Sequence, residues 1–167
     1  MNTKPKLKLL KNLALLTSLG FSTGMMADVR LSDLQDLALG TWNGVDPLQV
    51  NDDICIALST GEFYSVVATG QGSGNEFELA NGVDNILFEV FFNDDAGTNG
   101  NQKLSAGITL SGQSVPKGKK SKPKKNNKKP DCNKLNANLA IIIPNNHLQQ
   151  AQPGAYSGNL TLTVIPE

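Results

Sequence analysis

A strict two-residue alternation near the end of the chain constrains the fold more than any other feature. A turn signal at Pro153-Gly154 is followed by three apolar residues that alternate with threonines: Leu160, Leu162 and Val164. Apolar side chains at every second position, in a segment that favours extended backbone, predict a strand with one buried face. No later element follows it in this sequence, so we expect a strand at the edge of a sheet, which needs protection from unwanted pairing.

The preceding sequence contains further short apolar runs separated by Gly, Asn and Asp. We predict strands over 54–59, 63–69, 77–79, 86–92, 103–110 and 139–143. After residue 27 no sustained helical period occurs, and the stretch from His147 predicts one turn of helix at most. Strands at this spacing with turn signals between them are typical of an immunoglobulin-like β-sandwich, so the expected fold class is all-β.

The first 27 residues have the pattern of a secretory signal peptide. Four lysines precede a Leu-rich stretch from Leu13 to about Phe21, and Ala27 offers a small residue for cleavage. A membrane anchor is the alternative, but the apolar run is shorter than the roughly 20 residues that span a bilayer. We therefore predict an exported protein whose mature chain is residues 28–167, which suits one domain.

The two cysteines of the chain, Cys55 and Cys132, both lie in the predicted exported part. An even number of cysteines in an oxidising compartment predicts a disulfide between them. A reactive pair or a metal site is the lesser alternative, because no other Cys or His stands at ligand spacing. We expect no metal and no cofactor.

Charge is segregated along the chain, although 15 basic and 15 acidic residues make it formally neutral. Outside the signal sequence and one lysine-rich segment, the basic residues are Arg30, Lys103 and Lys134, so the body is strongly acidic. Segment 117–130 should be a solvated, disordered loop. Its lysines are candidates for binding anionic polymers such as extracellular DNA or acidic polysaccharide, or belong to a tolerated surface insertion: Lys117, Lys119, Lys120, Lys122, Lys124, Lys125, Lys128 and Lys129.

No set of residues in the sequence has the spacing of a known catalytic motif. The single histidine, His147, lies in a polar segment and is interpreted as a solvated side chain. Residues 93–101 are rich in Asn, Asp and Gly, as calcium-binding loops are, but their spacing differs from that of an EF-hand and favours a plain hairpin loop. We do not expect an enzyme.

Several motifs, taken in order, resemble the spore coat protein U domain and the related pilins of archaic chaperone–usher fimbriae. The similarity runs from about Asp53 to Glu167. Its motifs are Asp-Ile-Cys-Ile-Ala-Leu at 53–58, Phe-Tyr-Ser-Val-Val-Ala-Thr-Gly at 63–70, Phe-x-Leu-x-Asn-Gly at 77–82, Ile-Leu-Phe-Glu-Val-Phe-Phe-Asn-Asp at 86–94, Asp-Cys at 131–132 with Asn-Ala-Asn-Leu at 136–139, and Pro-Gly-Ala-Tyr-Ser-Gly-Asn-Leu-Thr-Leu-Thr-Val at 153–164.

The resemblance implies an incomplete immunoglobulin-like domain that lacks its last strand. In such pilins a periplasmic chaperone lends a strand during export, and the next subunit later supplies one. The implied partners are other pilin subunits, that chaperone and an outer-membrane usher. The implied location is the periplasm in transit and then the cell surface. A stand-alone adhesive module that binds anionic polymers through its lysines is the alternative function.

The resemblance also assigns roles to both ends of the mature chain. Leu160, Leu162 and Val164 would line one side of the acceptor groove. Residues 53–167 would form the pilin-like domain, and 28–52 an N-terminal extension with a candidate donor strand at Val29, Leu31 and Leu34. The apolar alternation of 28–39 is interrupted at Leu34, so this segment is alternatively the first strand of the domain itself.

Overall fold

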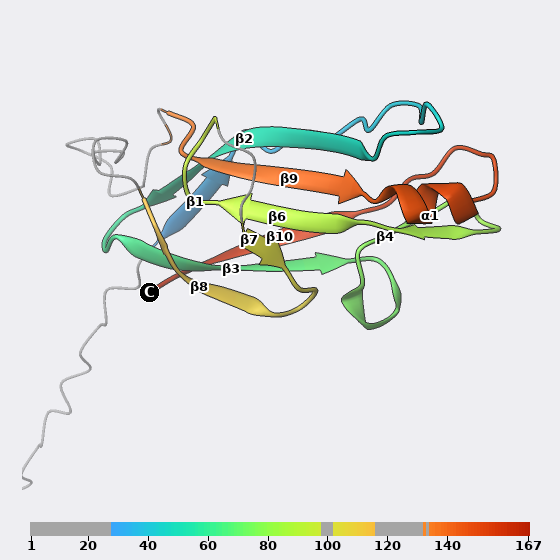
Figure 1. Cartoon of the computed structure of the whole chain (residues 1–167). Helices are drawn as coiled ribbons and strands as arrows, with labels where there is room; N and C mark the ends of the chain where they lie inside the picture. The colour runs from blue at the N-terminus through green and yellow to red at the C-terminus, as the bar shows by residue number, and fades with distance from the viewer. Residues whose placement is uncertain (1–27, 98–101, 116–131, 133) are drawn as a thin grey trace, which may run out of the picture.

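Two layers of antiparallel strands follow from the alternating sequence. The computed structural model describes residues 28–97, 102–115, 132 and 134–167, and in it strands are the dominant element (Figure 1). The larger layer has the strand order β1-β2-β9-β6-β7 and the smaller has the order β10-β3-β8. The predicted all-β immunoglobulin-like sandwich is confirmed at this level.

Each layer combines strands that are far apart in the sequence. The larger layer contains β1 (Val29–Ser32), β2 (Leu48–Leu58), β9 (Ala137–Ile143), β6 (Glu89–Asn93) and β7 (Gln102–Leu104). The smaller layer contains β10 (Leu160–Pro166), β3 (Phe63–Gly70) and β8 (Thr109–Ser114). A separate hairpin pairs β4 (Glu78–Ala80) with β5 (Asn85–Leu87), and two short helices complete the description, η1 (Ser73–Asn75) and α1 (Asn145–Gln150).

The core lies between the two layers. Ile54 and Ile56 of β2 and Phe92 of β6 are fully buried, as are Tyr64 and Val66 of β3. The rings of Tyr64 and Phe92 meet edge to face with centroids 6.3 Å apart, which joins the layers directly. Each such side chain contributes roughly 1.5–3 kcal/mol through burial, so this contact surface accounts for much of the stability of the sandwich.

The prediction of one continuous strand over 103–110 is wrong. The structure ends β7 at Leu104 and starts β8 at Thr109, with a turn between them in which Ile108 donates its N–H to the Ser105 carbonyl. Gly107 has a φ of +73°, which favours glycine and breaks the extended backbone. The apolar alternation therefore spans two strands that belong to different layers.

The predicted single strand 86–92 is also divided. Its first part, β5, pairs with β4, and its second part, β6, pairs with β9. Phe88 lies between them and donates its N–H to the Phe77 carbonyl at 3.0 Å, while the two rings stack. The chain changes partners at Phe88 without losing its alternation, so the sequence pattern does not show the break.

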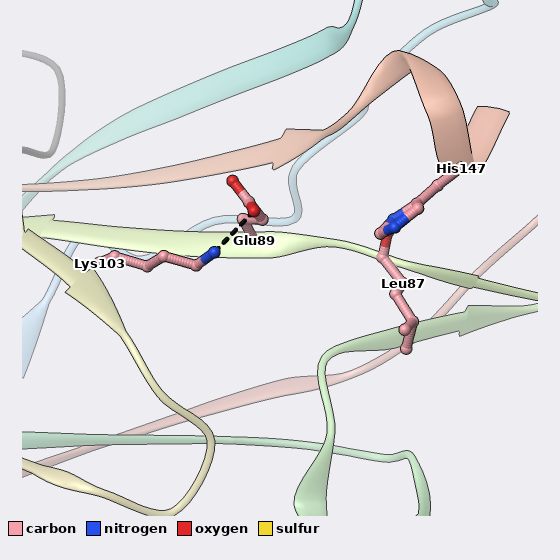
Figure 2. A network of polar contacts seen from close by, with 4 residues as sticks. All are labelled: Leu87, Glu89, Lys103 and His147. Carbon is pink, nitrogen blue, oxygen red and sulfur yellow. Dashed lines mark hydrogen bonds and ion pairs between the residues drawn. The ribbon is translucent and has the colours of Figure 1, made fainter.

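Two polar contacts fasten the end of the sandwich near α1. Figure 2 shows Lys103 of β7 paired with Glu89 of β6 at 2.6 Å, and His147 of α1 facing the Leu87 carbonyl. His147 Nδ1 lies 2.9 Å from that oxygen, which can only accept, so Nδ1 carries the proton. His147 thus fixes α1 to β5 rather than being a freely solvated side chain.

The disulfide between Cys55 and Cys132 is present, as predicted. Cys55 belongs to β2, is almost fully buried and stands opposite Ser32 of β1. Cys132 belongs to the connection that precedes β9 and lies with its Sγ 3.9 Å from the Arg30 carbonyl. The bridge therefore sits where β1, β2 and the start of β9 meet.

Candidate functional site

Strand β10 forms one edge of the smaller layer. It pairs over its whole length with β3, and in the described part of the chain no strand pairs with its other side. Its alternation is confirmed: three side chains are half-buried against the core and the threonines between them are exposed. The half-buried residues are the three predicted to line the acceptor groove, Leu160, Leu162 and Val164.

The free edge of β10 presents backbone groups that are available for pairing. Glu167, directly after β10, donates its N–H to the Phe63 carbonyl at 3.0 Å. In this register Glu167 and Phe63 therefore form a hydrogen-bonded pair. Hydrogen-bonded and non-hydrogen-bonded positions alternate in an antiparallel pair. The N–H and C=O groups of Thr161, Thr163 and Ile165 therefore point toward β3. Those of the intervening residues point away from β3: Leu160, Leu162 and Val164.

The segment that follows β1 lacks a strand partner in the described chain. β1 ends at Ser32, and the next residue, Asp33, has a φ of +68° that turns the chain out of the β2 ladder. From there Leu37, Leu39 and Trp42 are half-buried, while Asp36 and other intervening residues are exposed. Among the described residues, no backbone-to-backbone hydrogen bond joins 34–42 to another strand. Leu37 and Leu39 therefore alternate as in a strand, but Gly40, with a φ of +82°, interrupts the alternation before Trp42.

An apolar cleft of about 900 Å³ separates this segment from the chain that leads into β10. One wall is formed by 36–42 and the other by 151–158. The remaining lining residues are contributed by β2, β4, β5, β9 and α1: Leu48, Leu79, Ile86, Ile143 and Leu148. The three predicted groove residues of β10 lie just beyond the second wall and do not line this cleft themselves.

Tyr156 anchors the second wall to the β4–β5 hairpin. Its Oη lies 3.0 Å from Asp84 Oδ2 and 2.8 Å from the Gln152 carbonyl. Asp84 Oδ2 also accepts the Gln152 N–H, and Asp84 Oδ1 accepts the Asn85 N–H. Bonds from Gln152, Tyr156 and Asn85 lower the pKa of the Asp84 carboxyl. Desolvation, with the hydrogen bond to Asp84, raises the pKa of Tyr156.

Close backbone packing requires glycine in the same wall. Ser157 exchanges two backbone hydrogen bonds with Ala80 at 2.8 and 3.0 Å, which brings the chain directly against β4. A Cβ on the next residue, Gly158, would lie 2.5 Å from the Glu78 carbonyl oxygen. Only glycine fits at this approach, so the Tyr-Ser-Gly sequence holds the wall in place.

The first wall is held by a turn centred on Asn43. Asn43 Oδ1 accepts the N–H groups of Val45 and Asp46 at 2.9 Å each. Trp42 Nε1 donates to the Asp46 carbonyl at 2.8 Å. The polar atoms of Trp42 and Tyr156 are therefore bonded within the chain. The cleft consequently receives mainly apolar surface from both aromatic residues.

Acid should weaken the anchoring of the second wall. Asp84 has a lowered folded-state pKa, so its stabilising contribution is complete above its unfolded pKa of about 4 and is lost as the pH falls through the folded value. We expect Tyr156→Phe to lower Tm, and by more at pH 7 than at pH 3, in thermal unfolding followed by circular dichroism. In an Asp84→Asn background this pH dependence should disappear. An equal loss of Tm at both pH values would contradict the assignment.

Two of the three candidate donor residues lie in a paired strand, and the third lies outside it. Val29 and Leu31 belong to β1, pair with Leu58 and Ile56 of β2, and pack against the core. Leu34 lies beyond β1 and is 42% exposed. The domain boundary predicted at residue 53 falls inside β2, which begins at Leu48.

Four other sequence predictions concern residues that the structure describes only in part or not at all. The lysine-rich segment and its eight candidate lysines lie outside the described residues. Only part of 93–101 is described, and there Asp94 accepts from Ser114 while Asp53 accepts from Gly97. Within the described chain no cluster of three or more His, Cys, Asp or Glu could hold a metal. No described helix is long and apolar enough to cross a membrane.

Sequence reasoning did not identify the cleft. Leu37 and Leu39 carried a visible alternation, but they pointed to a donor strand rather than a wall. Leu148 comes from a helix of six residues and Ile86 from a three-residue strand, so neither has a periodic signal of its own. The Gly-x-Tyr-Ser pattern around Tyr156 was the one local clue.

Comparison with known proteins supports the fold and extends no further. No family model matches the sequence and no curated protein matches it. Among solved structures, a chain from a chaperone–tip adhesin complex of CFA/I fimbriae biogenesis is similar, with a TM-score of 0.57 and 16% sequence identity. The match covers 84% of this chain but 43% of the other, so this chain spans less than half of that protein. At this identity the likeness shows one thing: this chain has a fold found in a fimbrial complex.

Proposed function

We propose that this protein is an exported structural subunit of a surface fimbria or coat, of the spore coat protein U or archaic chaperone–usher pilin type. Its sandwich takes up a β-strand from a neighbouring subunit. A periplasmic chaperone occupies the same place during export, and an outer-membrane usher receives the subunit. This is a non-enzymatic role in which main-chain hydrogen bonds provide affinity and apolar pockets provide specificity.

One observation carries the proposal: in the described chain β10 has a free edge, and the chain that leads into it borders an apolar cleft whose opposite wall, 36–42, has no strand partner. The outward backbone groups of β10 supply one ladder for an added strand, and the unpaired backbone of 34–42 offers further hydrogen-bonding groups. A strand added to β10 and continued toward the cleft would turn every second side chain toward the apolar surface. The apolar surface of Leu39, Trp42 and Tyr156 favours large apolar side chains at those positions.

The chain contains a natural fluorescent probe for strand addition. Trp42 is the only tryptophan in the sequence and lines the cleft. We expect its fluorescence to change when a peptide of about ten residues, with Ile or Val at every second position, is added to the dilute mature chain. An extended peptide of this length spans about 33 Å, so it could pair along β10 and along the unpaired backbone of 34–42. At 100 times its Kd it should stabilise the fold by about 2.7 kcal/mol.

Two matched comparisons separate strand addition from nonspecific adhesion. A peptide of the same composition with its apolar residues in adjacent pairs should leave Trp42 fluorescence unchanged. Leu39→Asp should weaken binding of the alternating peptide at least tenfold, because the carboxylate would need desolvation in the cleft. Val83→Asp, at a residue that is 90% exposed and outside the cleft, should leave binding unchanged. Equal effects of both substitutions would argue against the cleft as the binding site.

A stand-alone adhesive module is the second candidate, favoured by the segregation of eight lysines from an acidic body. Such a module should remain monomeric and should not respond to the alternating peptide. It should bind heparin with steep salt dependence and lose that binding when the lysines are replaced by alanine. Both assays are run on the same preparation: a response to the alternating peptide favours the fimbrial subunit, and heparin binding without that response favours the adhesive module.

A further inference from the structure

We infer that this subunit accepts a strand but does not donate one, so that it stands at an end of the assembly rather than inside it. The inference rests on the proposed function, including removal of residues 1–27. An internal subunit of a strand-exchanged polymer must do both: its cleft is filled by one neighbour, and its free strand fills the cleft of another. In the described chain the cleft that would accept a strand is present, but the strand that would be donated already pairs within the domain.

The candidate donor strand is built into the larger layer. All four residues of β1 pair with β2, from Val29 opposite Leu58 to Ser32 opposite Cys55. The ladder is closed at its start by Asp28, whose N–H donates to Ser59 Oγ at 2.7 Å and whose carbonyl accepts the Ser59 N–H at 2.9 Å. Proposed cleavage after Ala27 would therefore leave the new chain end already bonded to β2.

Side chains and the disulfide hold β1 from both faces. Val29 and Leu31 pack against the buried core, so withdrawing β1 would expose apolar surface on both the strand and the sheet. On the other face, Cys132 lies beside the Arg30 carbonyl through its bridge to Cys55. Donation would thus dismantle the part of the sandwich that the disulfide stabilises.

The next segment is not a free strand either. Residues 34–42 are connected to β1 on one side and to β2 on the other, so they form a span with two fixed ends. Their inward residues Leu37, Leu39 and Trp42 form a wall of the chain's own cleft. A donor needs one free end to enter a neighbour. Segment 34–42 has none, and the chain end that precedes β1 is already bonded to β2.

A lock on β1 tests the inference with the exported, oxidised protein. Val29 and Leu58 stand at a non-hydrogen-bonded position of the ladder, where side chains are closest, so Val29→Cys with Leu58→Cys should form a second bridge. The doubly substituted Val29→Ser, Leu58→Ser protein is the matched unlocked control. A third protein carries the alternating peptide joined to Asp28 through a flexible linker, which adds the missing donor.

We expect the wild-type, locked and unlocked proteins to give the same Trp42 response to the free alternating peptide, and no concentration-dependent chains in light scattering after chromatography. The extended protein should form chains, and excess free peptide should disperse them. Chains formed by the wild type and unlocked control but not by the locked protein would overturn the inference while leaving strand acceptance intact. Retention of residues before Asp28 in the exported protein, measured by intact mass, would also overturn it.

Failure of the proposed function has a different signature. In that case no peptide would alter Trp42 fluorescence, and the extended protein would stay as dispersed as the wild type. This result would overturn strand acceptance and, with it, the end position inferred here.

Discussion

Replacing both cysteines, Cys55→Ala with Cys132→Ala, should lower the free energy of unfolding by about 4 kcal/mol. The bridge closes a loop with a sequence separation of 77 residues, and loop closure of this length removes that much entropy from the unfolded chain. It also joins β2 to the connection before β9. Both of these segments contact β1. Urea unfolding followed by circular dichroism measures the change.

Reduction of the wild-type protein provides the matched control for this prediction. It breaks the same bond without changing side-chain volume, so it should produce nearly the same loss of stability. A doubly substituted protein within 1 kcal/mol of the oxidised wild type, on the order expected for ordinary substitutions, would show that the bridge adds little to the fold.

Asn136→Ala should be the other strongly destabilising change, by about 2–6 kcal/mol. β9 begins at Ala137 opposite Ile54, so β2 loses its partner strand beyond that point. The buried Asn136 amide replaces it: Oδ1 accepts the Ile56 N–H and Nδ2 donates to the Ile56 carbonyl, both at 2.8 Å. Alanine would leave two buried backbone groups without partners, each at about 1–3 kcal/mol.

Two further substitutions sharpen the test of Asn136. Asn136→Asp keeps an acceptor for the Ile56 N–H but loses the donor and buries a charge, so it should destabilise strongly at pH 7 and less under acid conditions. Asn159→Ala, at an exposed residue, should change stability by no more than about 0.5 kcal/mol. A loss below 1 kcal/mol for Asn136→Ala in urea unfolding would contradict the ladder-completing role.

Local pattern was sufficient for some elements and insufficient for others. The alternation of Leu160, Leu162 and Val164 predicted β10 correctly, because its half-buried face and exposed face are each continuous. The bridge between Cys55 and Cys132 followed from an even count in a chain predicted to be exported. Both features depend on residues whose signal is independent of which strand lies beside them.

The errors arise where the chain changes partners. Between Lys103 and Leu110 the alternation continues through a turn at Gly107, and at Phe88 it continues while the strand passes from β4 to β9. Likewise, Leu39, Leu148 and Tyr156 form one cleft only because segments from three parts of the chain converge there. Such convergence is set by tertiary pairing, which alternation alone does not encode. Anion binding by the lysines stays a prediction, whereas the donation predicted for Val29, Leu31 and Leu34 is opposed by the inference that β1 remains within the domain.

The most direct test of strand acceptance is amide hydrogen exchange along β10, resolved by residue with NMR. Without peptide, the amides of Thr161, Thr163 and Ile165 should be protected by β3, and those of Leu160, Leu162 and Val164 should exchange rapidly. Saturation with the alternating peptide should protect the second set and leave the first unchanged. Continued rapid exchange of Leu160, Leu162 and Val164 at saturation, or their protection before any peptide is added, would contradict a free edge that accepts a strand.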